Sequence, residues 1–124
     1  MQKLNQTYIN TIVRKALEED LRPRGDITTN LITAKDKIIK AKIIAKQDGV
    51  IAGLDFCKTA FKLIGKESVF TKKISDGKKI KKKKVIAIIK AKKKTILTAE
   101  RTALNFLNHA SGIATLTNQF VKKI

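Results

Sequence analysis

The stretch from Ile39 to Lys46 constrains the fold most, because apolar and basic side chains alternate along it. Successive side chains of a strand point to opposite faces of a sheet, so this alternation is typical of a strand with one buried face. The apolar face would carry Ile39, Ala41, Ile43 and Ala45, and the opposite face would carry Lys40, Lys42 and Lys46. We therefore predict a half-buried strand here, in a sheet that is covered on one side.

Helical spacing of apolar residues occurs on both sides of this strand. Residues 5–20 place apolar side chains three and four positions apart, and the run 22–25, which contains proline and glycine, would end that helix. Residues 54–64 show the same spacing, and Gly65 would end a second helix. The last thirty residues again have helical spacing.

Two further strands are expected between the second helix and the C-terminal part. They are "SVFTKKI" (residues 68–74) and "VIAIIKA" (residues 85–91), with a turn signal at Asp76 and Gly77 between them. This order of elements predicts an α+β fold, a mainly antiparallel sheet with flanking helices. Lysines along the strands fit solvated faces and protected sheet edges.

Arg101 is the candidate binding residue. Thr98 is a plausible N-cap, which would place Arg101 in the first turn of a helix, where the free amides and the helix dipole disfavour a cation. An arginine beside free helix amides can bind a carboxylate or phosphate through two parallel hydrogen bonds. The alternative is a surface arginine paired with a neighbouring acid, and the sequence leaves both interpretations open.

Ser111 and Gly112 would break that helix. Ser111 could then cap a further helix from Thr117 to Ile124. The single histidine, His109, has no evident Asp, Ser or Cys partner in the sequence, so we interpret it as a structural or surface residue and assign no catalytic residue.

The net charge of +18 suggests a polyanionic partner, but the composition argues against specific nucleic-acid binding. Of the 28 basic residues only Arg14, Arg22, Arg24 and Arg101 are arginines, the residue type that suits base and phosphate recognition. Aromatic residues are 5% of the chain and do not interleave with the basic run 78–94, so no base-stacking surface is indicated.

Cysteine content and hydropathy indicate a cytoplasmic protein. Cys57 is the single cysteine, so it cannot form an internal disulfide, and we expect it in the core. The sequence has no apolar run of membrane-spanning length, and residues 1–10 lack the pattern of a secretory signal. No metal site is indicated by the spacing of His, Cys, Asp and Glu.

Five stretches together resemble one known family. They are "EEDLRPRGDITTNLI", "AKQDGVIAGLDF", "DGKKIKKKKVIAIIKAKKKTIL", "TAERTALNFL" and "SGIATLT". In this order they are similar to the N-terminal domain of quinolinate phosphoribosyltransferase, also called nicotinate-nucleotide pyrophosphorylase (carboxylating). The resemblance extends over essentially the whole chain, and the block "LTAERTALNFL…SGIAT" is its most specific part.

The resemblance implies a small α+β domain, an open sheet with helices, that precedes a phosphoribosyl-binding α/β barrel. It implies a homodimer in which this domain covers the barrel mouth of the other subunit. The arginine of the family's "AERT" motif matches Arg101, which would reach the substrate carboxylates across the dimer interface. Residues 1–110 would be the domain, and residues 111–124 the start of the connection to a barrel that these residues do not include.

The implied reaction belongs to NAD biosynthesis. It joins quinolinate and phosphoribosyl diphosphate to give nicotinate mononucleotide, carbon dioxide and diphosphate, with Mg²⁺ on the diphosphate. The family's other binding motifs lie in the barrel and do not occur in these 124 residues. We therefore expect no Mg²⁺ ligands in this chain and no activity of the chain alone.

Two positions depart from the family pattern. Where the family usually has glycines in the region after "DG", this sequence has Lys83 and Ala91. Two other functions remain open on the sequence alone. One is a degenerate interaction domain without catalysis, and the other is a lysine-rich polyanion binder.

Overall fold

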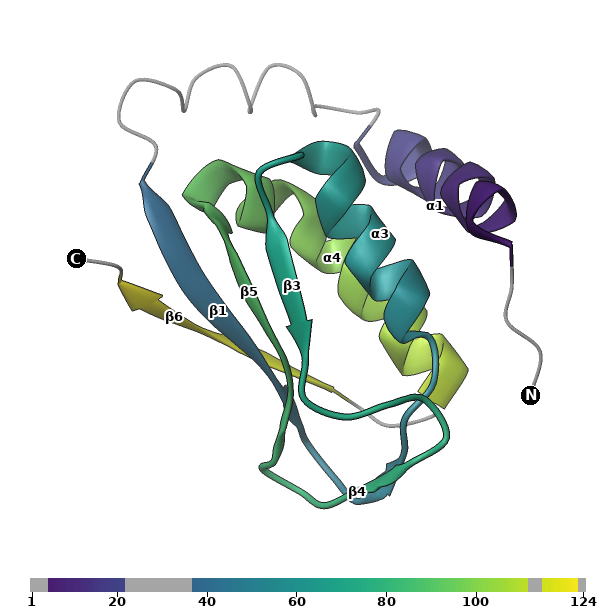
Figure 1. Cartoon of the computed structure of the whole chain (residues 1–124), viewed down its shortest axis with the longest axis vertical. Coiled ribbons are helices and arrows are strands. Elements are labelled where there is room, and N and C mark those ends of the chain that lie inside the picture. The colour runs from purple at the N-terminus through teal and green to yellow at the C-terminus, as the bar shows by residue number, and fades with distance from the viewer. Residues whose placement is uncertain (1–4, 22–36, 112–114, 123–124) are drawn as a thin grey trace.

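Four strands form one antiparallel sheet, and helices lie on one side of it, as the computed structural model shows (Figure 1). The structure describes residues 5–21, 37–111 and 115–122. The helices there are α1 (Gln6–Leu21), α3 (Leu54–Ile64) and α4 (Lys93–Ser111). The strands are β1 (Ile38–Ala45), β2 (Gly49–Val50), β3 (Val69–Lys72), β4 (Lys79–Ile80), β5 (Val85–Lys92) and β6 (Thr115–Lys122). The predicted α+β class with an antiparallel sheet is confirmed.

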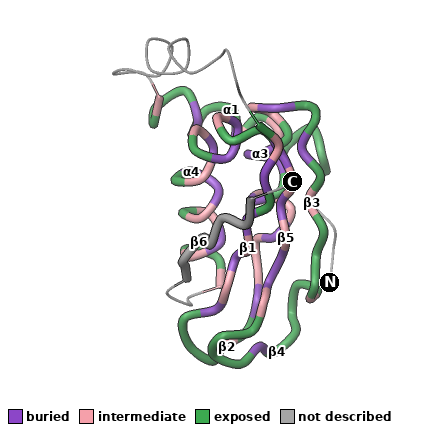
Figure 2. Tube along the Cα trace, turned by 90° about the vertical axis from the view of Figure 1, so that its left-hand side faces the viewer, coloured by how far each residue is buried: buried purple, intermediate pink, exposed green. Residues whose placement is uncertain are grey.

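β1 and β5 form the centre of the sheet, whose strand order is β3-β5-β1-β6. The residues expected on the buried face of β1 are all buried: Ile39, Ala41, Ile43 and Ala45. Figure 2 shows these buried positions interleaved with more exposed ones. Lys40 is exposed and pairs directly with Lys90 across the two central strands. The lysines of β1 therefore lie on the face opposite the helices, as the alternation predicts.

The core lies between the sheet and the helices. α3 and α4 pack on the sheet, and α1 packs on α3 and α4 from outside (Figure 1). Large, fully buried side chains come from every layer: Ile9, Val13, Ile43, Leu54, Phe61, Ile89, Ile96 and Leu107. Cys57 is buried among them, as predicted, and this burial raises the pKa of its thiol far above the usual value. An un-ionised, inaccessible thiol is a core residue and not a nucleophile.

Glycines at both ends of α3 allow close packing against α4, which runs antiparallel to it. Gly53 precedes α3 with φ +88°, and a Cβ there would lie 2.7 Å from the Cβ of Ala110 near the end of α4. A Cβ on Gly65 would lie 2.5 Å from Oγ1 of Thr95 near the start of α4. Because real Cβ atoms do not approach other atoms so closely, glycine at these two positions sets the distance between the helices.

The prediction of a helix from Thr117 to Ile124 capped by Ser111 is wrong. The hydroxyl of Ser111 donates a hydrogen bond of 2.6 Å to the carbonyl of Leu107, so it satisfies the end of α4 and does not start another helix. β6 follows and pairs antiparallel with β1, which would otherwise expose its backbone at the sheet edge. The expected helix stop at 22–25 lies outside the described residues, and α1 extends to Leu21.

The short strands β2 and β4 were not predicted, because two residues are too few to show a period. They pair with each other, and the chain then turns between β4 and β5. In this turn the N–H of Lys84 donates to the carbonyl of Lys81 at 3.1 Å, and Lys83 has φ +75°. A positive φ at the third residue is the geometry of a type II turn, which normally requires glycine or asparagine. Lys83 is also one of the two positions at which the family resemblance implies a glycine.

We expect Lys83→Gly to raise the free energy of unfolding by about 0.5–1 kcal/mol. Glycine removes the cost of a left-handed conformation, and its greater freedom in the unfolded chain offsets part of that gain. Urea denaturation measures the difference. Lys82→Gly, in the same exposed turn but without a positive φ, is the matched control and should not stabilise the protein. Equal effects of the two substitutions would contradict this account of the turn.

Candidate functional site

The prediction that Arg101 lies in the first turn of its helix, with Thr98 as N-cap, is wrong. α4 begins at Lys93, directly after β5, so Arg101 lies more than two turns inside the helix. The amides near Arg101 are therefore hydrogen-bonded within the helix and do not form an anion site with it. The local sequence favoured a helix start after Thr98. The group that bonds at the observed start, Lys93, comes from a distant part of the chain.

Glu67 supplies the negative charge at the start of α4. One carboxylate oxygen accepts a hydrogen bond of 2.8 Å from the hydroxyl of Thr95 and one of 3.2 Å from the backbone N–H of Lys92. Burial by itself would raise the pKa of Glu67, but these hydrogen bonds and the charge of Lys92 outweigh it and lower the pKa below its usual value. A carboxylate at a helix N-terminus is the arrangement that the helix dipole favours.

We expect Glu67→Gln to lower the free energy of unfolding at pH 7 by about 1 kcal/mol, a typical cost for a lost helix cap. A carboxyl group with a lowered native pKa stabilises the fold above its unfolded pKa, and this effect is lost as the pH falls through the native pKa. The difference between wild type and Glu67→Gln should therefore shrink below about pH 4. Urea denaturation across this pH range measures it.

Glu18→Gln is the control, because Glu18 is an exposed acid of α1 and no interaction is found for it among the described residues. It should leave stability nearly unchanged at every pH. A difference between wild type and Glu67→Gln that stays constant from pH 7 to pH 3 would rule out charge as the cause.

One exposed ridge runs along α4, and Arg101 lies at its centre. Its residues are spaced four apart, so they fall on consecutive turns of one helix face. We call this row the α4 ridge: Lys93, Leu97, Arg101, Asn105 and His109, all exposed. The opposite face of α4 is buried against α3, α1 and the sheet through residues such as Ile96, Ala103 and Leu107. Leu97 is 44% exposed, which is high for a leucine.

Arg101 has no hydrogen-bond or ion-pair partner within residues 5–21, 37–111 and 115–122. Side chains three and four positions away on the helix are those of Leu97, Thr98, Leu104 and Asn105, none of which is acidic. Lys72 and Asp55, by contrast, form an ion pair of 2.8 Å at the surface. The interpretation of Arg101 as a surface arginine paired with a neighbouring acid therefore finds no support among the described residues.

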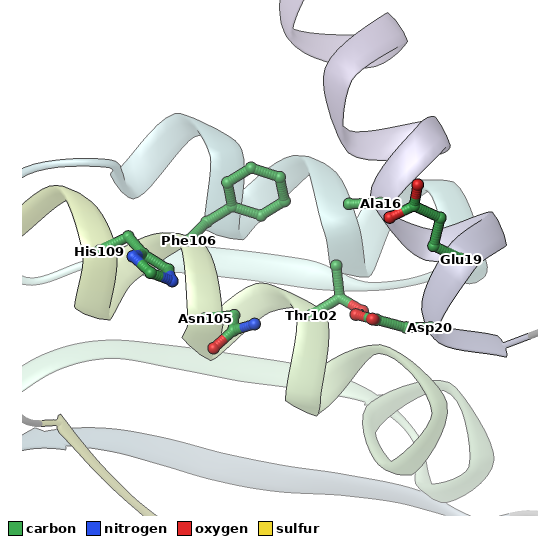
Figure 3. Close-up of a pocket in the computed structure, with 7 residues that line it drawn as sticks. All are labelled: Ala16, Glu19, Asp20, Thr102, Asn105, Phe106 and His109. Carbon is green, nitrogen blue, oxygen red and sulfur yellow. The ribbon is translucent and has the colours of Figure 1, made fainter.

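A hollow of about 240 Å³ lies beside the ridge, between α1 and α4 (Figure 3). Its lining residues are Ala16, Glu19, Asp20, Thr102, Asn105, Phe106 and His109. Asp20 accepts a hydrogen bond of 2.5 Å from the hydroxyl of Thr102, which ties α1 to α4. His109 is exposed at the rim, consistent with its interpretation as a surface residue. The two carboxylates make the hollow unfavourable for an anion.

Neither a metal site nor a membrane-spanning helix is found where the structure describes the chain. No group of three or more His, Cys, Asp or Glu side chains that could hold a metal ion occurs among those residues. None of the described helices is long and apolar enough to cross a membrane.

The sequence model of the family "Quinolinate phosphoribosyl transferase, N-terminal domain" matches residues 26–111. A probable nicotinate-nucleotide pyrophosphorylase (carboxylating) of Methanocaldococcus jannaschii is 41% identical over 117 residues, which are 94% of this chain and 39% of that protein. Nicotinate-nucleotide pyrophosphorylase (carboxylating) of Mycobacterium leprae is 33% identical over 116 residues, which are 90% of this chain and 40% of that protein.

Solved structures agree with this match. NadC from Streptococcus pyogenes superposes with a TM-score of 0.79 at 32% identity, covering 88% of this chain and 39% of that one. The nicotinate-nucleotide pyrophosphorylase from Francisella tularensis superposes with a TM-score of 0.76 at 33% identity. The match covers 86% of this chain and 37% of that one. The fold and the matched sequence are those of an α+β domain found in phosphoribosyltransferases. The chain belongs to the family of quinolinate phosphoribosyltransferase N-terminal domains, and it spans about two fifths of the length of these relatives.

Proposed function

We propose that this chain acts as the N-terminal domain of a quinolinate phosphoribosyltransferase in NAD biosynthesis. The reaction joins quinolinate and phosphoribosyl diphosphate, and it yields nicotinate mononucleotide, carbon dioxide and diphosphate. Substrates of this kind carry many negative charges, so binding requires cations that are not neutralised by the protein's own acids. The observation that carries the proposal is Arg101, an exposed arginine at the centre of the α4 ridge without a carboxylate partner among the described residues.

Arg101 would bind a carboxylate of quinolinate. A guanidinium forms two parallel hydrogen bonds with a carboxylate, and it keeps its charge at all physiological pH values. The ridge faces solvent, so its substrate would lie at an interface between this domain and another one. We propose that this interface is formed in a homodimer, where the domain of one subunit covers the barrel mouth of the other.

The remaining parts of the proposal concern the complete enzyme. Mg²⁺ would neutralise the diphosphate and would be held outside this chain. A boundary between residues 110 and 111 agrees with the end of the family match at residue 111, although β6 beyond it pairs with β1. We propose that the chain alone is inactive and that the enzyme works in the cytoplasm.

A chimera tests the role of Arg101. In it, this 124-residue chain replaces the matching N-terminal part of the Methanocaldococcus jannaschii relative. We expect the chimera to form nicotinate mononucleotide, and Arg101→Ala to raise the KM for quinolinate about 10- to 100-fold, the loss expected for hydrogen bonds to a charged group. Steady-state kinetics at saturating phosphoribosyl diphosphate provide the measurement.

Arg14→Ala is the matched control, because Arg14 is an exposed arginine on α1 and its loss changes the net charge equally. It should leave the KM within about twofold. Equal effects of the two substitutions would contradict the proposed role of Arg101. A folded chimera without any activity would instead favour an interaction domain without a catalytic part.

A further inference from the structure

The face of the four-stranded sheet that points away from the helices carries a group of lysines. In the described part of the chain no helix covers this outer face (Figure 1). β1 and β5 place Lys40, Lys42 and Lys90 on it, and we call these three the sheet-face lysines. Lys40 is exposed and the other two are half-buried, so their long side chains can bring the charged groups into solvent.

The pairing of β1 with β5 brings these lysines close together. Lys40 lies directly opposite Lys90, and residues paired in this way have Cβ atoms about 4.5–5.5 Å apart. Lys42 is the diagonal neighbour of Lys90, about 7–8 Å away. Like charges directly opposite each other lower the stability of a sheet. The fold therefore gains nothing from this arrangement, whereas binding of an external anion would relieve the repulsion.

None of the sheet-face lysines forms an ion pair in the described part of the chain. The sequences of β1, β3 and β5 contain no Asp or Glu, and no residue paired with these lysines across the strands is acidic. Lysines at the strand ends differ in this respect, because Lys72 pairs with Asp55 and the charge of Lys92 acts on Glu67. The middle of the sheet therefore presents uncompensated positive charge.

The phosphate backbone of duplex DNA suits this face. The duplex carries one negative charge per about 1.7 Å of its axis, so neighbouring lysines can each neutralise a phosphate. A lysine ammonium acts as a point charge, whereas arginine is the residue that typically reads base edges. The contact would therefore be independent of the base sequence.

Two other anionic partners fit this face less well. A single strand binds through bases that stack on aromatic rings, but Phe70, the aromatic residue of β3, packs toward Phe61 on the helix side. A lipid surface requires apolar side chains that insert between the lipids. Val69 is 53% exposed on this face, and one valine offers little area for insertion.

We propose that the sheet-face lysines bind the phosphate backbone of duplex DNA without sequence preference. This contact goes beyond the proposed role in NAD biosynthesis, and it involves neither Arg101 nor the rest of the α4 ridge. It agrees with the small number of arginines in the chain, which argues against reading of bases and not against attraction to phosphates.

Fluorescence anisotropy of a labelled DNA duplex, titrated with the 124-residue chain, tests the proposal. Replacing all three sheet-face lysines by glutamine should weaken binding at least about tenfold at about 50 mM salt. The slope of log K against log salt should fall in magnitude by about 2–3, because each lost phosphate contact removes about 0.9. Lys40→Gln alone, at the exposed position, should remove about 0.9. Urea denaturation should show no loss of stability, since repulsion between Lys40 and Lys90 disappears.

The matched control replaces Arg14, Lys15 and Lys58 by glutamine. These are exposed cations of α1 and α3, so the net charge changes equally. The control should bind the duplex within about twofold of wild type, because cations on the helix side lie more than a screening length from the DNA. Equal weakening by the two triple variants would overturn the proposal, since net charge alone would then explain the binding.

Three further results would overturn the proposal. One is an unchanged salt slope in both the triple variant and Lys40→Gln. Another is tighter binding to a single strand, or to vesicles of anionic lipid, than to the duplex. The last is a chimera with the Methanocaldococcus jannaschii relative that does not bind the duplex, because the sheet face would then be covered within the complete enzyme.

Discussion

The contact between Glu67 and the start of α4 determines which side chains the protein presents to its surroundings. Glu67 accepts hydrogen bonds from Lys92 and Thr95 at the point where β5 continues into α4, which begins at Lys93. The glycines at the ends of α3 then fix how closely that helix packs against its neighbour. With the start and the packing of α4 set, the positions four residues apart that remain exposed are those of the α4 ridge.

Three acids among the described residues accept hydrogen bonds from backbone N–H groups. Besides Glu67, Asp76 accepts the N–H of Leu54 at the start of α3, and Asp48 accepts the N–H of Lys82 in the turn before β5. The sequence holds ten acids against 28 basic residues. With several acids committed to helix starts and turns, cations such as Arg101 remain without a carboxylate in the described residues and suit an external anion.

Elements with a clear local periodicity were predicted correctly from the sequence. Elements that depend on contacts between distant parts of the chain were not. The alternation in β1, the helical spacing of α1 and α3, and the stop at Gly65 led to correct elements. The start of α4 could not be predicted, because its bonding partners are distant in the sequence: Glu67 accepts from Thr95, and the carbonyl of Lys37 accepts from the N–H of Lys93. β6 was mistaken for a helix because its pairing with β1 joins positions far apart in the chain. Arg101 was predicted as a binding residue from an incorrect position in the first helical turn and from the family resemblance. Its role in substrate binding stays a proposal.

The central claim is that the α4 ridge presents Arg101 to a carboxylate of quinolinate. A crystal structure of the chimera with pyridine-2,3-dicarboxylate bound tests it most directly. The account predicts the guanidinium of Arg101 about 2.7–3.2 Å from carboxylate oxygens of the ligand, with the ridge facing the barrel of the other subunit. A ligand bound in the barrel with Arg101 turned into solvent would contradict it.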